Sequence, residues 1–314
     1  MRAQALRASP ATKTDAVRSP RTVRGLGGTE VSWLFLLPAL AVYTFVVLYP
    51  SAAGAYYAFT DWNGLDHTHS FVGFDNFREL LHDDQATSAL KATVLLAIAI
   101  TFIQNGLGLL LALGVNANIK SRNYLRTHFL APAVLTPIVV AYLWKYIYSP
   151  RGALNALLES VGLDSLTRRW LGDSSLALWA VAAVVIWQYA GFSMVIFLAG
   201  LQNVPQELYE AAEIDGAGAF WKFIHVTFPL IAPATTVNLV LSMIGGLKLF
   251  DHVFALTEGG PGHATETLST MIYDQGFTFG YFGYFTAVAL VLTMIISALA
   301  LLQLSIWRSR EVVA

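Results

Sequence analysis

The stretch EAAEIDGAGAFWKFIHVTFPLIAP occupies residues 210–233 and lies between two strongly apolar segments. Pro205 stands shortly before it, and a proline suits the first turn of a helix because the N–H that it lacks would have no partner there. The pattern predicts a helix over about 206–214. Gly216 and Gly218 then interrupt the helical pattern and permit a sharp turn. The stretch therefore predicts a helix, a tight turn and a second helix outside the apolar segments.

The two predicted helices present different faces. On the first, one face is small in its middle, so another surface can approach it closely; its residues are Leu208, Ala211, Ala212 and Asp215. On the second, apolar side chains recur at helical spacing; these are Phe220, Phe223, Ile224 and Phe228. We expect this apolar side to lie on the rest of the protein. Taken alone, the pattern fits a stable interfacial loop without a partner as well as a rigid docking projection.

The composition places the chain in a lipid bilayer. Of its 314 residues 56% are hydrophobic and only 12% are charged, and the mean hydropathy is +0.57, which is too apolar for an ordinary soluble domain. The formal net charge of −1 gives no indication of nucleic-acid binding. The chain has no cysteine, which excludes disulfides, thiolate metal sites and cysteine nucleophiles.

Six apolar runs are long enough to cross the roughly 30 Å of hydrocarbon in a bilayer. They are continuous rather than alternating, which predicts helices and not a barrel, since a helix satisfies its own backbone polar groups in lipid. We place them at about 33–50, 93–115, 127–148, 176–200, 228–248 and 285–306. The predicted fold class is thus an all-α integral membrane protein with six transmembrane helices.

The distribution of basic residues predicts the orientation. The first thirty residues carry basic side chains among small polar ones and contain no apolar run, which indicates a disordered cytoplasmic arm over 1–30 followed by a transmembrane domain over 31–314. We expect the first span to be kept as a signal anchor. Both termini are then cytoplasmic, as is the stretch 210–233, and the loops 61–84 and 251–283 are external.

Motifs for bond chemistry are missing from the sequence. It contains no G-x-x-x-x-G-K-[ST], so it has no P-loop with which to hold nucleotide phosphates. It also lacks H-E-x-x-H and G-x-S-x-G, which disfavours a membrane hydrolase. We therefore expect a protein that is not an enzyme and has no cofactor or metal of its own.

Three separated segments resemble one known family. The spacing of Glu210-Ala211-Ala212, Gly216, Ile224, Phe228-Pro229 and Pro233 is similar to the EAA loop of permease subunits in binding-protein-dependent ABC importers. FVGFDNFRELL (71–81) and LTEGGPGHATETLSTMIYDQGF (256–277) agree with that family, and the second resembles the first of the two permeases in maltose-type systems. The resemblance implies the type I permease fold, with a cytoplasmic EAA coupling loop over about 203–228.

The resemblance also implies which residues couple transport to ATP. In that family the loop forms a coupling helix that docks into a groove of a separate ATPase. Glu210 and Asp215 would then offer charges to basic residues of the ATPase, while Ala211, Ala212 and Gly216 would permit close packing.

A solute path through such a subunit needs polar and aromatic groups near mid-membrane, because a sugar requires partners for its hydroxyls and cover for its apolar ring faces. The fourth and fifth spans supply such groups. By the resemblance, six residues in or next to these spans fall on sugar-binding positions of the maltose-type permease; they are Gln188, Tyr189, Phe192, Ser242, Gly246 and Leu249. Several differ in residue type from that permease, so the resemblance implies the place of the site and not the sugar.

Other polar residues of the spans have simpler interpretations. Gln104 and Asn105 are expected to be hydrogen-bond partners between helices. Lys248 lies three residues from Asp251, which favours a local ion pair over a solute contact.

The resemblance implies a set of partners. These are a second homologous permease, two cytoplasmic ABC ATPase subunits, and an extracellular or periplasmic binding protein that delivers a sugar, with oligosaccharides expected, onto loops that include residues 259–262. The setting would be a bacterial inner or plasma membrane, with no nucleic acid involved.

The alternative functions are an importer for a polyol or a sugar phosphate such as glycerol 3-phosphate, a secondary transporter, an intramembrane enzyme, and a scaffold that binds a partner but transports nothing. A secondary transporter would need buried carboxylates, and none lies in the predicted spans.

Overall fold

The computed structural model describes residues 35–117 and 119–308. These residues are helical, and the only β pairing among them is an isolated bridge between Thr60 and Phe71. The arm predicted over residues 1–30 lies outside the described residues.

The chain divides into two compact units, residues 1–51 and 52–314. The described part of the first unit begins with α1 (Leu37–Tyr43), a π-helical segment η2 (Thr44–Leu48) and the start of α2 (Tyr49–Tyr57). Together these elements make one apolar helix over Leu37–Tyr57, and none of the residues in its most apolar 18-residue stretch is buried. It has the length and composition of a membrane span.

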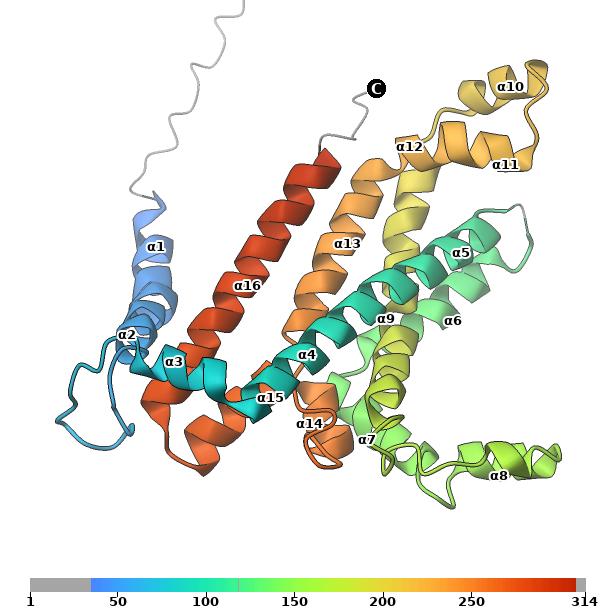
Figure 1. Cartoon of the computed structure of the whole chain (residues 1–314). Coiled ribbons are helices and arrows are strands. Elements are labelled where there is room, and N and C mark those ends of the chain that lie inside the picture. The colour runs from blue at the N-terminus through green and yellow to red at the C-terminus, as the bar shows by residue number, and fades with distance from the viewer. Residues whose placement is uncertain (1–34, 118, 309–314) are drawn as a thin grey trace, which may run out of the picture. The chain divides into compact units, whose positions relative to one another are not determined.

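The second unit contains the remaining helices, which Figure 1 shows in chain order. Their bounds are α3 (Asp75–His82), α4 (Asp84–Ala99), η3 (Ile100–Gln104), α5 (Asn105–Asn116), α6 (Arg122–Val134), α7 (Pro137–Ile147), α8 (Ala153–Ser160), η4 (Asp164–Leu166), α9 (Ala177–Gln202), α10 (Gln206–Ile214), α11 (Ala219–Lys222), η5 (Phe223–Thr227), α12 (Phe228–Leu230), α13 (Ala232–Leu247), α14 (Asp251–Thr257), α15 (Leu268–Tyr273), η6 (Asp274–Thr278) and α16 (Phe282–Arg308).

Four described helices are long and apolar enough to cross a membrane, and there are up to six if each of two bent pairs is one span. The four straight candidates are Leu37–Tyr57, Asp84–Asn116, Ala177–Gln202 and Phe282–Ile306. They correspond to the runs predicted at 33–50, 93–115, 176–200 and 285–306. The other two predicted runs are not straight helices: α6 and α7 meet at 97°, and the helix over Ala219–Leu230 meets α13 at 69°.

The break in the third run has a local cause. Proline disfavours helical backbone at the residue before it, and Thr136 is accordingly extended before Pro137, which begins α7. Leu135 is extended as well, and its N–H is donated to the carbonyl of Pro132. The prediction of one continuous helix over 127–148 was therefore wrong in shape, although the apolar residues are there.

Helix α9 is the centre of the second unit. It packs against α5, α6, α13, α14 and the π-helical segment η3, and most of its residues are buried. Glycines let its neighbours approach: a Cβ at Gly108 would lie 2.6 Å from Cβ of Ser193, and one at Gly191 would collide with the backbone carbonyl of Phe129. Close packing through small residues is the usual basis of helix association in membranes.

Candidate functional site

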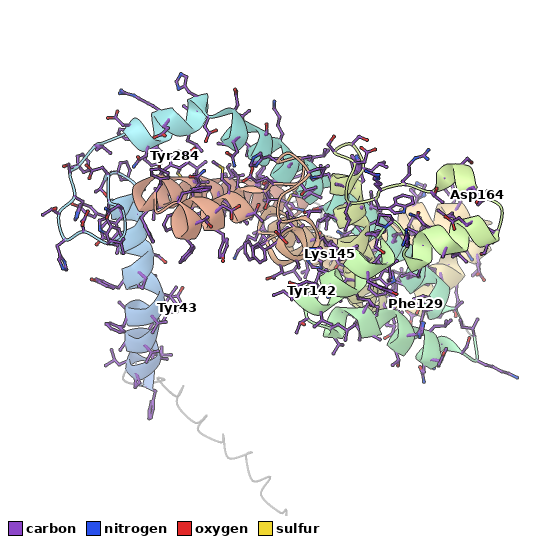
Figure 2. All side chains as sticks on the ribbon, turned by 90° about the horizontal axis from the view of Figure 1, so that it is seen from below. Tyr43, Phe129, Tyr142, Lys145, Asp164 and Tyr284 are labelled. Carbon is purple, nitrogen blue, oxygen red and sulfur yellow. The ribbon has the colours of Figure 1, made fainter. Side chains whose placement is uncertain are left out.

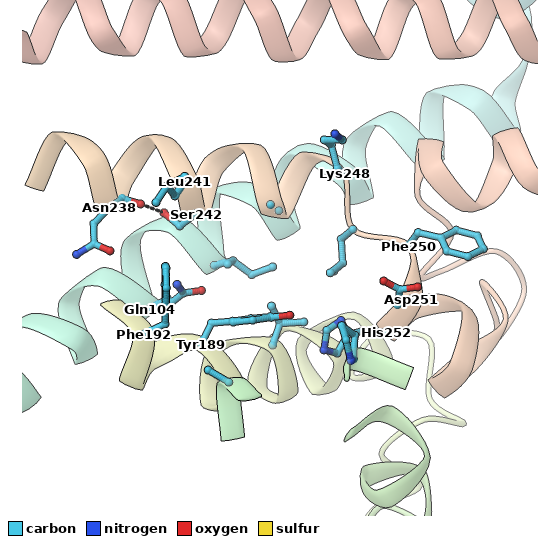
Figure 3. A pocket seen from close by; sticks show the side chains of 17 residues that line it. Gln104, Tyr189, Phe192, Asn238, Leu241, Ser242, Lys248, Phe250, Asp251 and His252 are labelled. Atoms are coloured by element: carbon cyan, nitrogen blue, oxygen red, sulfur yellow. Dashed lines mark hydrogen bonds between the residues drawn. The ribbon is translucent and has the colours of Figure 1, made fainter. Parts of the chain in front are cut away.

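A cavity of about 390 Å³ lies in the second unit between α9, α13 and the beginning of α14. Figure 3 shows Tyr189 and Phe192 on one side and Asn238 and Ser242 on the other, with His252 and Asp251 at one end. The polar and aromatic residues that line it are Gln104, Tyr189, Phe192, Asn238, Ser242, Lys248, Phe250, Asp251 and His252. The cavity therefore combines flat aromatic surfaces with hydrogen-bonding groups, as a sugar requires.

Buried hydrogen bonds hold the side of the cavity formed by α13. Ser242 Oγ accepts a hydrogen bond from Asn105 Nδ2 at 2.7 Å and donates one to the carbonyl of Asn238 at 2.8 Å. Gln104 Nε2 lies 2.9 Å from the hydroxyl of Ser193, and Asn238 Nδ2 donates to the carbonyl of Ser193 at 3.1 Å. The expectation that Gln104 and Asn105 join helices is confirmed.

A second set of hydrogen bonds fixes the end of the cavity at α14. Gln188 is fully buried, and its Nε2 donates to the carbonyl of Leu135 at 3.0 Å, in the break between α6 and α7. Its Oε1 lies 2.7 Å from Nε2 of His252. Because the amide nitrogen must face the carbonyl, Oε1 is the acceptor, and His252 must carry its proton on Nε2. Gln188 thus joins α14 to the broken span.

The structure brings five of the six residues of the predicted solute path to this one cavity, namely Tyr189, Phe192, Ser242, Gly246 and Leu249. Gln188 is the exception, because it lies behind the wall and both ends of its amide are used by protein groups.

Sequence reasoning missed two lining residues of the α14 end. His252 is 2% exposed and follows Asp251 in α14. The only sequence signal was the acidic and imidazole pair just after the fifth apolar run, and that pattern is common in solvated loops. The local ion pair expected between Lys248 and Asp251 is not formed among the described residues, although both line the cavity.

Gly246 lines the cavity and also packs closely against a neighbouring helix. A Cβ at Gly246 would lie 2.7 Å from the backbone Cα of Ala97 in α4, whereas a Cβ at the neighbouring Gly245 would meet nothing within 4 Å. We expect Gly246→Ala to destabilise the purified protein by about 1–3 kcal/mol through overpacking, seen as a lower thermal unfolding midpoint. Gly245→Ala is the matched control, because both glycines line the cavity. Equal midpoints for the two variants would contradict a packing role.

Burial lowers the pKa of His252 to about 4 from the ordinary 6.5. Between these values the unfolded chain binds a proton that the folded protein does not, so this contribution is present above pH 6.5 and is lost as the pH falls toward 4. The titratable groups that line the same cavity as His252 are Tyr189, Lys248 and Asp251. We expect the thermal midpoint to fall between pH 6.5 and 4, and His252→Gln to flatten that dependence. The exposed His67→Gln is the control; a wild-type slope in His252→Gln would refute the assignment.

The helix pair predicted from residues 210–233 projects at one end of the second unit (Figure 1). Helix α10 covers Gln206–Ile214, as expected, and Gly216 follows with a φ of +76°. Gly218 has a φ of −69° in extended backbone and precedes α11. Only the first glycine therefore occupies the left-handed region that side chains disfavour.

Two contacts tie the arms of the projection together. Tyr209 in α10 makes a 3.0 Å hydrogen bond with the hydroxyl of Thr227, and Lys222 Nζ lies 2.6 Å from Glu213 Oε1. The Lys222 contact lowers the pKa of the Glu213 carboxyl. Both contacts join α10 to the returning segment, so the projection is a single braced element.

The predicted coupling residues lie on this projection. Glu210, Ala211, Asp215 and Gly216 are exposed and Ala212 is half-buried. The apolar side of the second helix was expected to lie on the rest of the protein, and this was wrong for three of its four residues: Phe223 is half-buried, but Phe220 is 70% exposed, and Ile224 and Phe228 are also exposed. The tip therefore presents apolar surface that the described chain leaves uncovered, as Ile214 does at 88% exposure.

The loop after α14 is held in a defined shape. Residues Glu258, Gly259, Gly262 and His263 all have positive φ. Beyond them Glu266 is 2% exposed, and its carboxylate accepts hydrogen bonds from Gln85 Nε2 and lies 2.7 Å from Nδ1 of His263. This clamp fixes the loop to the start of α4.

Helices apolar and long enough to cross a membrane surround a cavity lined by polar and aromatic side chains, an arrangement expected of a membrane protein that binds a solute. Residues 104–310 match the family model described as the inner membrane component of binding-protein-dependent transport systems. The chain belongs to that family, as its sequence motifs implied, and is a multi-pass inner-membrane protein.

Individual relatives agree along nearly the whole chain. The probable ABC transporter permease protein YurN of Bacillus subtilis is 37% identical over 282 residues, which cover 89% of this chain and 96% of YurN. The multiple sugar-binding transport system permease protein MsmF of Streptococcus mutans is 33% identical over 291 residues, covering 93% of this chain and 100% of MsmF. A chain in the crystal structure of a bacterial ABC transporter that imports the acidic polysaccharide alginate matches with a TM-score of 0.78 and 25% identity, over 89% of this chain and 95% of that one. The fold is thus the type I permease fold of ABC importers.

Proposed function

We propose that this chain is the transmembrane permease subunit of an ATP-driven importer for sugars, with oligosaccharides as the substrate class. The observation that carries the proposal is the cavity, in which the rings of Tyr189 and Phe192 can cover sugar faces while Asn238 and Asp251 offer hydrogen-bond acceptors. The names of relatives support it, since MsmF is called a sugar transport permease and the structural neighbour imports alginate.

The solute path in this proposal is shared between two permeases. Tyr189, Phe192, Ser242, Gly246 and Leu249 line the part contributed by this chain. Gln188, which the sequence placed among the solute contacts, holds the wall behind them. We assign the other half to a second, homologous permease, as the resemblance to maltose-type systems implies.

Coupling to ATP is assigned to the projection. Its exposed tip docks into a groove of a cytoplasmic ABC ATPase, with Glu210 and Asp215 facing basic groups and Ala211, Ala212 and Gly216 in close contact. One ATPase binds this chain and another binds the second permease. The apolar surface left uncovered at Phe220 and Ile214 supports docking, since exposed apolar patches mark interaction sites.

Both chain termini and the projection are cytoplasmic in this arrangement, and the α14 end of the cavity faces the periplasm or cell exterior. The clamped loop containing residues 259–262 receives the solute from a binding protein. Closure of the two ATPases on ATP then shifts the permease between inward- and outward-facing states by binding one state more tightly than the other.

A second candidate substrate class is a polyol or a sugar phosphate such as glycerol 3-phosphate. Lys248 lines the cavity and has no ion-pair partner among the described residues, and an ammonium group is a common phosphate ligand.

The test is ATP hydrolysis by the complex reconstituted with its candidate permease, ATPase and binding-protein partners, across a panel of oligosaccharides, polyols and sugar phosphates. Stimulation by an oligosaccharide supports the proposal. Stimulation by a sugar phosphate alone selects the second candidate. An assembled complex that hydrolyses ATP without stimulation by any solute would favour a scaffold that transports nothing.

A further inference from the structure

At two residues that line the cavity, Asn238 and His252, the hydrogen-bond partners determine which atom donates and which atom is left to accept. Asn238 Nδ2 donates to the backbone carbonyl of Ser193, and a carbonyl can only accept. The amide oxygen of Asn238 therefore points the other way and has no partner among the described residues. Gln104 gives no such constraint, because its partner is the hydroxyl of Ser193, which can donate or accept.

His252 is fixed in the same way, through Gln188. The imidazole donates from Nε2 to Oε1 of Gln188, whose own nitrogen is committed to the carbonyl of Leu135. The remaining ring nitrogen, Nδ1, has no partner in the described chain, and the ring lines the cavity beside the hydroxyl end of Tyr189 (Figure 3). With a pKa of about 4 the ring is neutral near pH 7, so Nδ1 offers a lone pair.

Asp251 adds a third acceptor at the same end. It lines the cavity and makes no side-chain hydrogen bond or ion pair within the described residues. Ser242 has no proton left to donate, since its hydroxyl donates to the carbonyl of Asn238 and accepts from Asn105, and only one lone pair remains on its oxygen. Tyr189 is the one lining hydroxyl that can still donate.

Donors for an anion are correspondingly few. No arginine of the described residues lines the cavity, and arginine is the side chain suited to hold a carboxylate or phosphate through two bonds. Within the described part of the chain Lys248 is the only lining cation, and Figure 3 shows its side chain leading away from Tyr189 and Asp251. An anionic ligand beside Tyr189 would therefore face a carboxylate and two unpaired acceptors.

We infer that the cavity selects an uncharged, hydroxyl-rich solute and rejects uronates and phosphates, with Asn238 Oδ1, His252 Nδ1 and the Asp251 carboxylate accepting hydrogen bonds from its hydroxyls. The inference rests on the proposed function and narrows its substrate class. It separates this chain from its structural neighbour, whose importer takes an acidic polysaccharide.

The test measures solute binding to the assembled complex in lipid nanodiscs without the binding protein, so that only the permease path contributes specificity. The probes are neutral di- to tetrasaccharides, each paired with a uronate oligosaccharide of the same length. We expect at least about tenfold tighter binding of the neutral member of one or more pairs. Raising the salt concentration should narrow that ratio, because it screens repulsion from Asp251.

The variant Asp251→Asn keeps the shape and removes the charge. We expect it to reduce the preference for the neutral member by about threefold or more, chiefly by strengthening uronate binding. The control is Asp164→Asn, the same change at an exposed residue outside the cavity; Figure 2 shows Asp164 at the opposite end of the second unit from Tyr284. It should leave the preference unchanged.

The outcomes separate this inference from the proposed function. Uronates that bind as tightly as neutral sugars, or a preference that Asp251→Asn leaves intact, would overturn the inference. If such uronates also stimulate ATP hydrolysis, the importer function stands with a different substrate class. An assembled complex that binds no member of the panel and shows no stimulation would overturn both.

Discussion

Replacing Gly216 by serine is expected to reduce solute-stimulated ATP hydrolysis of the assembled complex by roughly 5- to 30-fold. Gly216 has a φ of +76°, and a Cβ there would meet nothing within 4 Å. The effect therefore comes from backbone conformation alone, since holding an ordinary residue in the left-handed region costs about 1–2 kcal/mol. That cost lowers the ratio of the correctly shaped turn to competing shapes by roughly 5- to 30-fold, and the stimulated rate falls by this factor when the ATPase must select the correct shape from a minor population. The measurement is the ATPase rate with and without solute.

Two further variants isolate the cause. Gly218→Ser places the same side chain in equally open space, but at a φ of −69°, where serine is also a good N-cap for α11. It should retain near wild-type stimulation. Gly216→Asn should retain more than Gly216→Ser, because asparagine tolerates the left-handed conformation better. Equal losses in both serine variants would show that the tip is sensitive to bulk and not to the shape of this turn.

Replacing Gln188 by leucine is expected to destabilise the protein by about 2–5 kcal/mol. The change leaves two groups without partners, the part-buried carbonyl of Leu135 and the buried N–H of His252, and each costs about 1–3 kcal/mol, with the carbonyl at the lower end of that range. Leucine has nearly the same volume, so a cavity adds little. The measurement is the thermal unfolding midpoint of the purified protein, together with the fraction recovered as a monodisperse species.

The double variant Gln188→Leu with His252→Leu tests whether the two side chains act as a pair. It removes the orphaned N–H of His252, so the combined loss should be smaller than the sum of the single losses by about 1 kcal/mol or more. Additive losses would mean that the 2.7 Å contact contributes little to stability.

The apolar runs predicted the helices well because each run is longer than a globular helix needs to be. Hydropathy did not show whether an apolar run forms one straight helix or two helices at an angle. The run over 127–148 is apolar throughout, yet α6 and α7 meet at 97°, because Pro137 forces extended backbone at Thr136. Pro132 and Pro137 were visible in the sequence, and giving them more weight than the apolar count would have predicted the break.

The candidate site was predictable in place and less so in detail. Alignment to a family put Tyr189, Phe192 and Ser242 at one cavity, where the structure has them. The same alignment predicts Gln188 as a solute contact, but its amide bonds the backbone carbonyl of Leu135 in a helix break and the ring of His252, and no local pattern reveals either partner. His252 was also missed, because its burial depends on the packing of α14 against α9, and local sequence does not show that packing.

The braced projection has a mechanical consequence for the cavity. Helix α9 runs into α10, and η5 and α12 run into α13, so the two arms end on the helices that carry Tyr189 and Asn238. The projection is thus connected directly along the chain to both helices that line the cavity, α9 and α13. At the other end α9 and α14 are joined by the hydrogen bond of Gln188 and His252. A displacement of the projection therefore reaches both sides of the cavity, and it acts on the hydrogen bonds that join α9 to α13 and to α14.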